Sequence, residues 1–164
     1  MTARTDDIVE ISQTLARYAV TITQGDIEGL LAVFTPDGTY SAFGDTYPLP
    51  EFPALVAAAP KGLFLTGTPA VEFTGEDTAT GTQPLCFIDQ STHDMRIGYY
   101  QDTYLRTEAG WRLRTRAMTF IRRNGAHNSG IPHAYRAAAS RVDTPFPGGT
   151  TPGPPGPYPP APAR

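Results

Sequence analysis

The sequence has a single cysteine among its 164 residues, Cys86, so the chain cannot form an intrachain disulfide. Cys86 lies in the apolar run Leu85-Cys86-Phe87-Ile88, where a thiol usually serves as a small buried hydrophobe. A buried structural thiol is therefore the favoured interpretation, and a reactive thiol is the alternative. Without disulfides the fold must rest on a hydrophobic core, which the 40% of hydrophobic residues can supply.

Charged residues are also scarce, because they make up 18% of the chain and leave a net charge of -3. The sequence has no basic stripe, which argues against a nucleic-acid partner. No apolar run approaches the ~20 residues of a membrane-spanning helix, and the N-terminal residues lack the apolar region of a signal peptide. We therefore expect no nucleic-acid partner, no membrane partner and a cytoplasmic location in a bacterium.

Histidine is rare as well, with only His93, His127 and His133 in the chain. No two of them have the spacing of metal ligands on one helix or strand. The sequence also lacks a glycine-rich phosphate loop after a strand and a nucleophile elbow. We therefore expect neither a metal ion nor another cofactor.

Residues 96–123 are, by contrast, rich in the aromatic and apolar residues that strands prefer. They predict two long strands joined by a tight turn at Glu108-Ala109-Gly110. Because side chains alternate between faces, one face of the first strand is expected to carry Arg96, Gly98, Tyr100, Asp102, Tyr104 and Arg106. Asp102 lies either on a solvated face or in a polar spot inside a concave sheet, and the alternation alone leaves both open.

The rest of the chain predicts an α+β fold in which an antiparallel sheet curls around a long first helix. Helices are expected at 6–24, 26–34 and 54–59, a turn at 35–38, and strands at 39–43, 63–73 and 78–88. The first helix has an apolar stripe of Ile8, Ile11, Leu15, Ala19 and Ile22. Gly25 is expected to end it, and Asp26 to cap the second helix.

The composition changes towards the C-terminus. Residues 144–164 contain nine prolines and few residues able to form a core, so we expect a disordered or polyproline II tail. The folded domain is expected to span residues 1–143, with a short helix between Pro132 and Arg141.

Two segments resemble the SnoaL-like branch of the nuclear-transport-factor-2-like superfamily, which has a cystatin-like α+β cone. One runs from Arg17-Tyr18-Ala19 to Asp37-Gly38, and the other contains Tyr100-Gln101-Asp102-Thr103-Tyr104 and Gly110-Trp111-Arg112-Leu113. The resemblance covers roughly residues 5–123. It implies a deep, often apolar pocket between the curved sheet and the helices, in a fold that hosts many chemistries.

The resemblance also implies roles for particular residues. Tyr18 lies where ketosteroid isomerases place a tyrosine that holds an oxyanion. Asp102 lies where those isomerases place a protonated aspartic acid, and where SnoaL-type polyketide cyclases place an acid/base aspartate. Arg116 is a candidate partner for Asp102 or for a substrate carbonyl, with a surface position as the alternative.

The sequence departs from these relatives at the positions of their other catalytic groups. The general-base carboxylate of the isomerases would fall near Ala42. The Asp/His pair of scytalone-type dehydratases would fall near Thr23 and near Phe64 or Leu65. Asp45 is the carboxylate nearest to the missing base and is expected in a loop.

Two functions remain open from the sequence. The first is a cofactor-independent isomerase, cyclase or lyase that stabilises an enolate of an apolar, polyketide- or steroid-like carbonyl compound, with Tyr18, Asp102 and Arg116 in the site. The second is a module on the same fold that binds a small apolar ligand or assembles without chemistry. A homodimer formed through the outer face of the sheet is expected in either case.

Overall fold

The computed structural model describes residues 4–121 and 127–128. In chain order the elements are α1 (Thr5–Gln24), α2 (Ile27–Leu31), β1 (Phe34–Ala42), β2 (Asp45–Pro48), the 3-10 helix η1 (Leu49–Glu51), α3 (Phe52–Ala58), β3 (Gly62–Thr66), β4 (Ala70–Phe73), β5 (Thr78–Asp89), β6 (Met95–Thr107), β7 (Gly110–Ile121) and β8 (His127–Asn128).

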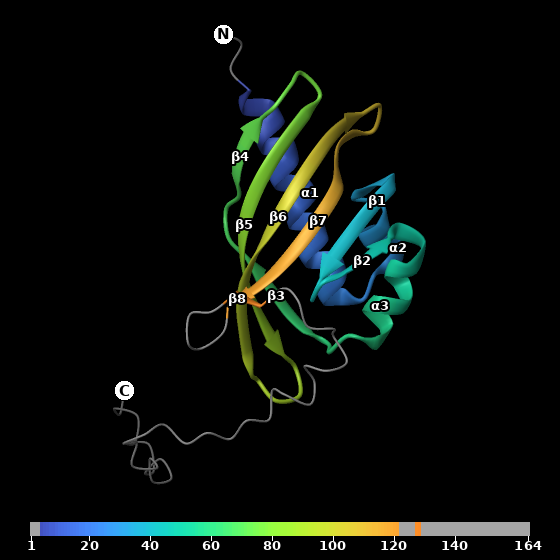
Figure 1. Ribbon diagram of the computed structural model, residues 1–164, viewed down its shortest axis with the longest axis vertical. Coiled ribbons are helices and arrows are strands. Elements are labelled where there is room, and N and C mark those ends of the chain that lie inside the picture. Colours follow the sequence, from blue (N-terminus) through green and yellow to red (C-terminus); the bar gives the residue numbers. More distant parts are fainter. Residues whose placement is uncertain (1–3, 122–126, 129–164) are drawn as a thin grey trace, which may run out of the picture.

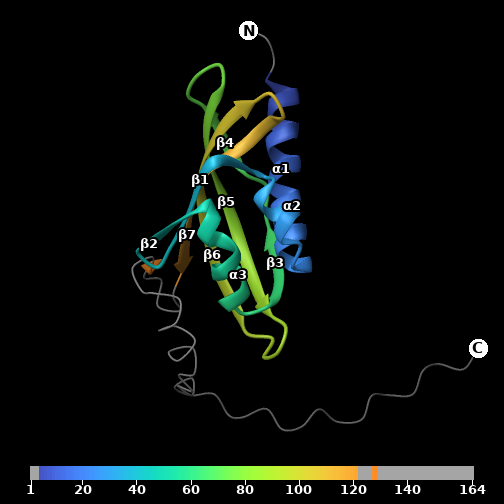
Figure 2. The same cartoon turned by 90° about the vertical axis from the view of Figure 1, so that its right-hand side faces the viewer.

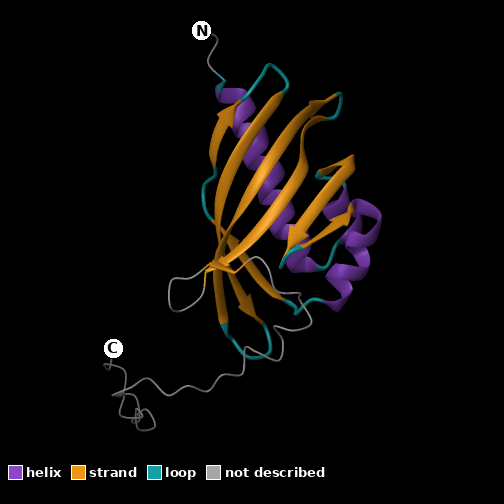
Figure 3. Cartoon of the chain, viewed as in Figure 1, coloured by secondary structure: helices purple, strands orange, loops and turns teal. Residues whose placement is uncertain are grey.

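The strands form one curved sheet in the order β2-β1-β7-β6-β5-β3, with β4 paired to β5 and β8 to β7. All pairs are antiparallel except β1 and β7, which are parallel. Helix α1 runs along one face of the sheet (Figure 1), as the side view in Figure 2 also shows. Helices α2 and α3 lie beside the β1–β2 end (Figure 3). The predicted α+β class and the sheet curved over a long first helix are confirmed.

Helix α1 buries one side against the sheet. Ile11, Leu15 and Tyr18 have no exposed surface, and Thr14 is buried between them. Ile8, which the sequence placed in the apolar stripe, is 44% exposed, so the buried stripe begins one turn later than predicted. The left-handed Gly25, with φ of 74°, ends the helix as predicted.

Trp111, at the start of β7, joins the hairpin to α1 through all of its polar groups. Its indole Nε1 donates to Asp7 Oδ1 at 3.1 Å, its backbone N–H donates to Glu10 Oε1 at 3.1 Å, and its carbonyl accepts from Thr14 Oγ1 at 3.0 Å. The three partners are spaced three and four residues apart, which places them on one helix face. Gly110 makes room for this contact, because a side chain there would overlap the Glu10 carboxylate.

The stretch after α2 differs from the prediction. Asp26 caps α2 by accepting a hydrogen bond from Gly29 N at 2.9 Å, but the helix ends at Leu31, and Phe34 already belongs to β1. Residues 35–38 form no separate turn. They bulge within β1, whose pairing with β7 resumes only at Thr39.

Two further boundaries are corrected. The single predicted strand 63–73 is two strands, β3 and β4, which pair with different parts of β5. Asp45 was expected in a loop and instead opens β2, where it pairs with Ala42. The predicted hairpin over 96–123 is confirmed as β6 and β7, and the predicted 54–59 helix is found as α3.

Cys86 is half-buried rather than fully buried, because it lies on the outer face of β5 while Leu85 and Phe87 point inward. The domain boundary at 143, the tail from 144 and the helix between Pro132 and Arg141 lie outside the described residues. Among the helices of the described ranges, none combines the length and apolar character that crossing a membrane requires.

The Asp7 carboxylate should contribute to stability in a pH-dependent way. Hydrogen bonds from Arg106, at 2.8 Å, and from Trp111 hold its pKa below the usual value. A lowered pKa stabilises the fold above the ordinary aspartate pKa of about 4 and loses that contribution as the pH falls below it.

We therefore expect Asp7→Asn to lower the free energy of unfolding by about 1–2 kcal/mol at pH 7. The difference from the wild type should shrink as the pH falls below about 4. Urea unfolding at several pH values measures this. Asp6→Asn is the control, because Asp6 is exposed on the same helical turn, and a loss of equal size in that variant would contradict the prediction.

Candidate functional site

The concave face of β6 carries a row of polar side chains in the protein interior. Tyr100, Asp102 and Tyr104 are 1%, 3% and 2% exposed, and all three point towards α1. The predicted alternation along this strand is confirmed. Of the two positions left open for Asp102, the structure shows the buried one.

Arg116 reaches the same face because of a β-bulge in β7. Thr103 pairs with Thr115 and Tyr104 pairs with Leu113, so Arg114 has no partner on β6. The extra residue changes the alternation, and Leu113 and Arg116 both point inward although they are three residues apart. Arg116 then lies directly opposite Asp102 and is 0% exposed.

Asp102 and Arg116 form a bidentate ion pair. Arg116 Nε donates to Asp102 Oδ1 at 2.9 Å and Arg116 Nη2 donates to Oδ2 at 2.7 Å. Tyr104 Oη donates to Oδ2 at 2.9 Å, and Arg116 Nη2 also donates to Gln83 Oε1 at 3.0 Å. Asp102 therefore accepts three hydrogen bonds here. The arrangement expected from the isomerases, a protonated Asp102 that donates to a ligand, does not occur because a guanidinium occupies both oxygens.

Two tyrosine rings enclose the guanidinium. Arg116 Cζ lies 4.2 Å from the centroid of the Tyr18 ring and 3.9 Å from that of Tyr100. Such cation–π contacts favour a buried arginine where water cannot solvate it. Within the described residues, Tyr18 Oη and Arg116 Nη1 are buried without a well-formed hydrogen bond, although the Tyr18 hydroxyl lies near the side chains of Tyr100 and Arg116 and interacts with them.

Burial sets the protonation of the tyrosines. It raises the pKa values of Tyr18, Tyr40 and Tyr100, because a phenolate would be poorly solvated in this interior. Burial alone would lower the pKa of Arg116, but the charge and hydrogen bonds of Asp102 raise it above its usual value. At neutral pH the site therefore holds protonated hydroxyl groups beside a permanent cation.

An apolar cavity of about 60 Å³ lies next to this network. Residues of α1, α3 and six strands line it, together with the segments that follow β1 and α3. The lining residues are Ile22, Tyr40, Ala42, Phe43, Tyr47, Phe52, Leu55, Val56, Ala59, Pro60, Phe64, Leu85, Phe87, Arg96, Tyr100, Met118 and Phe120. Tyr18, Asp102 and Arg116 are not part of it. Tyr100 does line the cavity, and its ring lies between the cavity and Arg116. The expectation that Tyr18 and Asp102 both open into the pocket is therefore wrong in this structure.

The positions at which relatives carry catalytic groups do converge on the cavity. Ala42 and Phe64 line it, and the backbone N–H of Phe64 donates to Thr23 Oγ1 at 3.1 Å. The two positions of the dehydratase Asp/His pair are thus neighbours here, but neither carries an ionisable group. Leu65 points to the outer face and is 49% exposed.

Other candidates fall away from the cavity. Asp45 is exposed and 3.4 Å from Tyr47 Oη. His93 lies in the β5–β6 turn with φ of 58°, His127 belongs to β8, and His133 is outside the described residues. Across the described ranges, no cluster of three or more histidine, cysteine, aspartate or glutamate residues could hold a metal ion.

Sequence reasoning missed two residues of the cavity, Tyr40 and Arg96. The predicted alternation did place Arg96 on the same strand face as Asp102. It gave no reason to assign Arg96 to the site, because the two residues lie six positions apart along the strand. Nothing in the sequence indicated Tyr40. Its place in the site depends on the pairing of β1 with β7, which puts Tyr40 beside Arg116.

A family model and solved structures of other proteins agree with the fold described above. The family model of the SnoaL-like domain matches residues 3–117. Rv3472 from Mycobacterium tuberculosis, a protein of unknown function solved as a point variant, is 27% identical over 71% of this chain and 77% of its own, with a TM-score of 0.65. No curated protein matches the chain.

Two structures from Novosphingobium aromaticivorans share the fold at lower identity. A nuclear-transport-factor-2-like protein with a cystatin-like fold is 24% identical over 80% of this chain and 88% of its own, with a TM-score of 0.64. A protein named provisionally as a scytalone dehydratase is 15% identical over 76% and 87%, also with a TM-score of 0.64.

The buried ion pair should matter far more to stability than an exposed one. We expect Asp102→Ala to cost about 3–5 kcal/mol in urea unfolding, because it leaves the Arg116 charge buried without a partner. Replacing both partners with apolar residues, as Asp102→Leu with Arg116→Met, should restore much of that loss.

The control is Asp37→Ala, which removes the exposed partner of Arg114 at 3.3 Å. It should leave the unfolding midpoint almost unchanged, because water and salt screen such pairs. An Asp102→Ala variant as stable as the Asp37→Ala variant would contradict the geometry described here.

Proposed function

The chain belongs to the SnoaL-like domain family, and on that premise we propose that it is a small cofactor-independent enzyme acting on an apolar carbonyl compound. Its cavity would bind the carbon skeleton, and hydrogen-bond donors at the inner end would stabilise negative charge on the carbonyl oxygen. Ketone isomerisation, aldol-type cyclisation and elimination next to a carbonyl group pass through such an enolate. Because the described lining has no carboxylate and no histidine, the proton removed to form it would pass to water. Polyketide-like or steroid-like ring compounds are the substrate class that fits the apolar lining.

The observation that carries this proposal is a pair of buried donors behind the Tyr100 ring, which a ligand oxygen could reach only if that ring moved. In the described part of the chain, Tyr18 Oη and Arg116 Nη1 are buried and make no well-formed hydrogen bond; the side chains nearest to the Tyr18 hydroxyl are those of Tyr100 and Arg116. An unpaired buried donor costs about 1–3 kcal/mol, and a ligand oxygen that reached it would recover that energy. Donors fixed in a dry site stabilise a developing oxyanion strongly, because they need no reorganisation during the reaction.

The charge balance of the site suits this role. Asp102 neutralises Arg116 on the side away from Nη1, so the pair can be buried while one N–H group stays available. The raised pKa values of Tyr40 and Tyr100, caused by burial, keep their hydroxyls protonated at neutral pH. Both residues line the cavity, and we propose that their hydroxyls donate to a ligand oxygen there.

The cavity is small in this state. About 60 Å³ is room for a few water molecules, so a ring compound must displace part of the wall. Phe52, Leu55 and Val56 of α3 form one side, and α3 is a short helix of 7 residues that begins next to Pro53. We propose that α3 moves to enlarge the cavity, which would shift the buried side chains of Phe52 and Val56.

A second function is favoured by what the lining lacks. Among the described residues, the lining includes no carboxylate and no histidine, and Ala42 stands where the isomerases keep their base. A pocket with donors and no base binds an enolate or phenolate without abstracting a proton. A non-catalytic carrier or sensor of such compounds is thus the alternative. Dehydratase-like neighbours support an enzyme-like fold but not a reaction.

Binding of 2-naphthol tests the donor role. We expect Tyr100→Phe and Tyr18→Phe each to weaken binding by about 1–3 kcal/mol, because each removes one buried donor. Fluorescence titration measures the dissociation constant. Tyr99→Phe, on the opposite face of β6, should change it little. Equal affinity in all four proteins would remove the basis of the proposal.

The same variants separate the two functions when 2-tetralone is incubated in D₂O. An enzyme should accelerate deuterium exchange at the carbon between the ring and the carbonyl group, and Tyr100→Phe should reduce that acceleration. Donor-dependent binding of 2-naphthol without any acceleration would favour the carrier.

We further propose that the protein is a homodimer. The strand register places six apolar side chains in two rows on the outer face: Leu65, Cys86 and Ile97 in one, and Leu63, Ile88 and Met95 in the other. Four of them, Leu63, Leu65, Met95 and Ile97, are 43–69% exposed. A contiguous exposed apolar patch of this kind is typical of an interaction surface.

Sedimentation velocity should show a species of twice the 17.7 kDa chain. The double variant Leu65→Thr with Ile97→Thr should shift it to the monomer, because it interrupts one row. Val9→Thr with Val20→Thr is the matched control, since these valines are 54% and 52% exposed on α1. A monomeric wild-type protein at micromolar concentration would contradict the dimer.

A further inference from the structure

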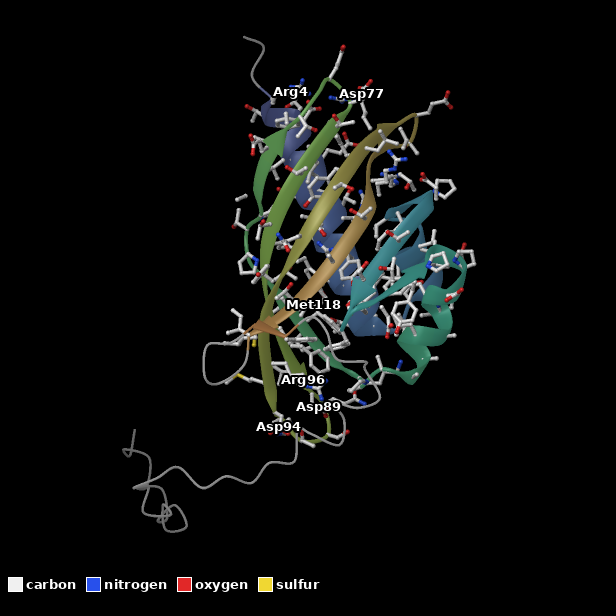
Figure 4. All side chains as sticks on the ribbon, viewed as in Figure 1. Arg4, Asp77, Asp89, Asp94, Arg96 and Met118 are labelled. Carbon is white, nitrogen blue, oxygen red and sulfur yellow. The ribbon has the colours of Figure 1, made fainter. Side chains whose placement is uncertain are left out.

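Arg96 is the one positively charged side chain that lines the cavity within the described residues. It lies on the concave face of β6, four residues before Tyr100, and pairs across the sheet with Phe87. Its Cζ atom is 5.7 Å from the centroid of the Phe87 ring. Figure 4 shows Arg96 between Met118, another lining residue, and the turn that carries Asp89 and Asp94.

Beyond its contact with the Phe87 ring, Arg96 has no close polar partner in the described residues. Across residues 4–121 and 127–128, its guanidinium makes no ion pair and no hydrogen bond. Asp89, the carboxylate whose charge acts on it, is committed to its own turn, where it accepts from Ser91 N at 2.8 Å and Thr92 N at 3.2 Å. Arg96 is half-buried, so water can still solvate its guanidinium, and a ligand in the cavity can replace that water.

We propose that the ligand of this cavity is a carboxylate, and that Arg96 binds its carboxylate group at the end opposite to the tyrosine hydroxyls. This inference rests on the proposed function of the cavity and names its substrate class more narrowly. A guanidinium matches a planar carboxylate with two parallel hydrogen bonds, which makes it selective for that group over an uncharged one.

The spacing along β6 sets the length of the ligand. Arg96 and Tyr100 are four residues apart, so their Cα atoms are separated by about 13 Å. Both side chains point into the cavity, which shortens the distance between their polar ends. Gly98 lies between them on the same face, and the Met118 side chain covers it, because Met118 Cε comes within 3.1 Å of the position that a Cβ at Gly98 would take. Met118 must therefore move aside for a ligand that reaches both residues. A rigid skeleton of two fused rings, with an oxygen at one end and a carboxylate at the other, fits this spacing.

The test compares two ligands of equal shape, 6-hydroxy-2-naphthoate and 6-hydroxy-2-naphthamide, which differ in charge at the end that faces Arg96. At pH 7.5 the wild-type protein should bind the acid about tenfold more tightly than the amide, as expected for charge-assisted hydrogen bonds. Arg96→Gln should bring the two affinities to the same value by weakening the acid alone. Arg96→Lys should keep a reduced preference, because the charge remains.

Arg17→Gln is the matched control, since Arg17 is exposed on α1 and its loss changes the net charge equally. It should leave the preference for the acid unchanged. A loss of preference in Arg17→Gln, or an unchanged preference in Arg96→Gln, would overturn the role of Arg96.

The outcomes also separate this inference from the function on which it rests. If both ligands bind and Tyr100→Phe weakens both, but the wild-type protein does not distinguish acid from amide, the donor site stands and the carboxylate inference fails. If neither ligand binds, the proposed function fails and this inference fails with it. A sulfonate analogue that binds as tightly as the carboxylate would show recognition of charge alone and overturn the assignment of a carboxylate.

Discussion

The buried pair of Arg116 and Asp102 is the interaction on which the interior of this protein depends. Removing two charges from water costs several kcal/mol for each ion, and the pair is tolerable only if the remaining donors and acceptors are also satisfied. Gln83 and Tyr104 supply hydrogen bonds, and two tyrosine rings cover the guanidinium. The incomplete satisfaction of one group, Arg116 Nη1, is therefore the feature that calls for a functional explanation.

The backbone is shaped to allow this pair. Without the bulge at Arg114, strict alternation from Trp111 and Leu113 would direct Arg116 to the outer face. The glycine opposite Asp102, Gly81, is equally necessary, since a Cβ there would lie 2.9 Å from Tyr104 Oη and block its hydrogen bond to Asp102. The site thus depends on local departures from a regular sheet, which bring together side chains from β5, β6 and β7.

The polar network and the apolar cavity are adjacent but separate, and Tyr100 belongs to both. Its ring lines the cavity on one side and lies 3.9 Å from Arg116 Cζ on the other. The proposed binding of an apolar compound uses this arrangement, with tyrosine side chains towards one end of the cavity and Arg96 towards the other. Ala42 and Phe64, which lie where the resemblance led us to expect an isomerase base and one member of a dehydratase pair, are both apolar residues of the cavity wall.

The sequence by itself determined the α+β class, the first helix with its end at Gly25, the β6–β7 hairpin and the grouping of Tyr100, Asp102 and Tyr104 on one strand face, because hydrophobic periodicity and turn residues act locally. That this face is the buried one was decided by the tertiary structure. The sequence also identified Arg116 as a candidate partner of Asp102. Only the tertiary structure decided that Asp102 accepts from Arg116 instead of donating, that Tyr100 screens Tyr18 from the cavity, and that Arg96 lines it. Those outcomes depend on a bulge and on strand register, which are set by packing between segments far apart in the chain.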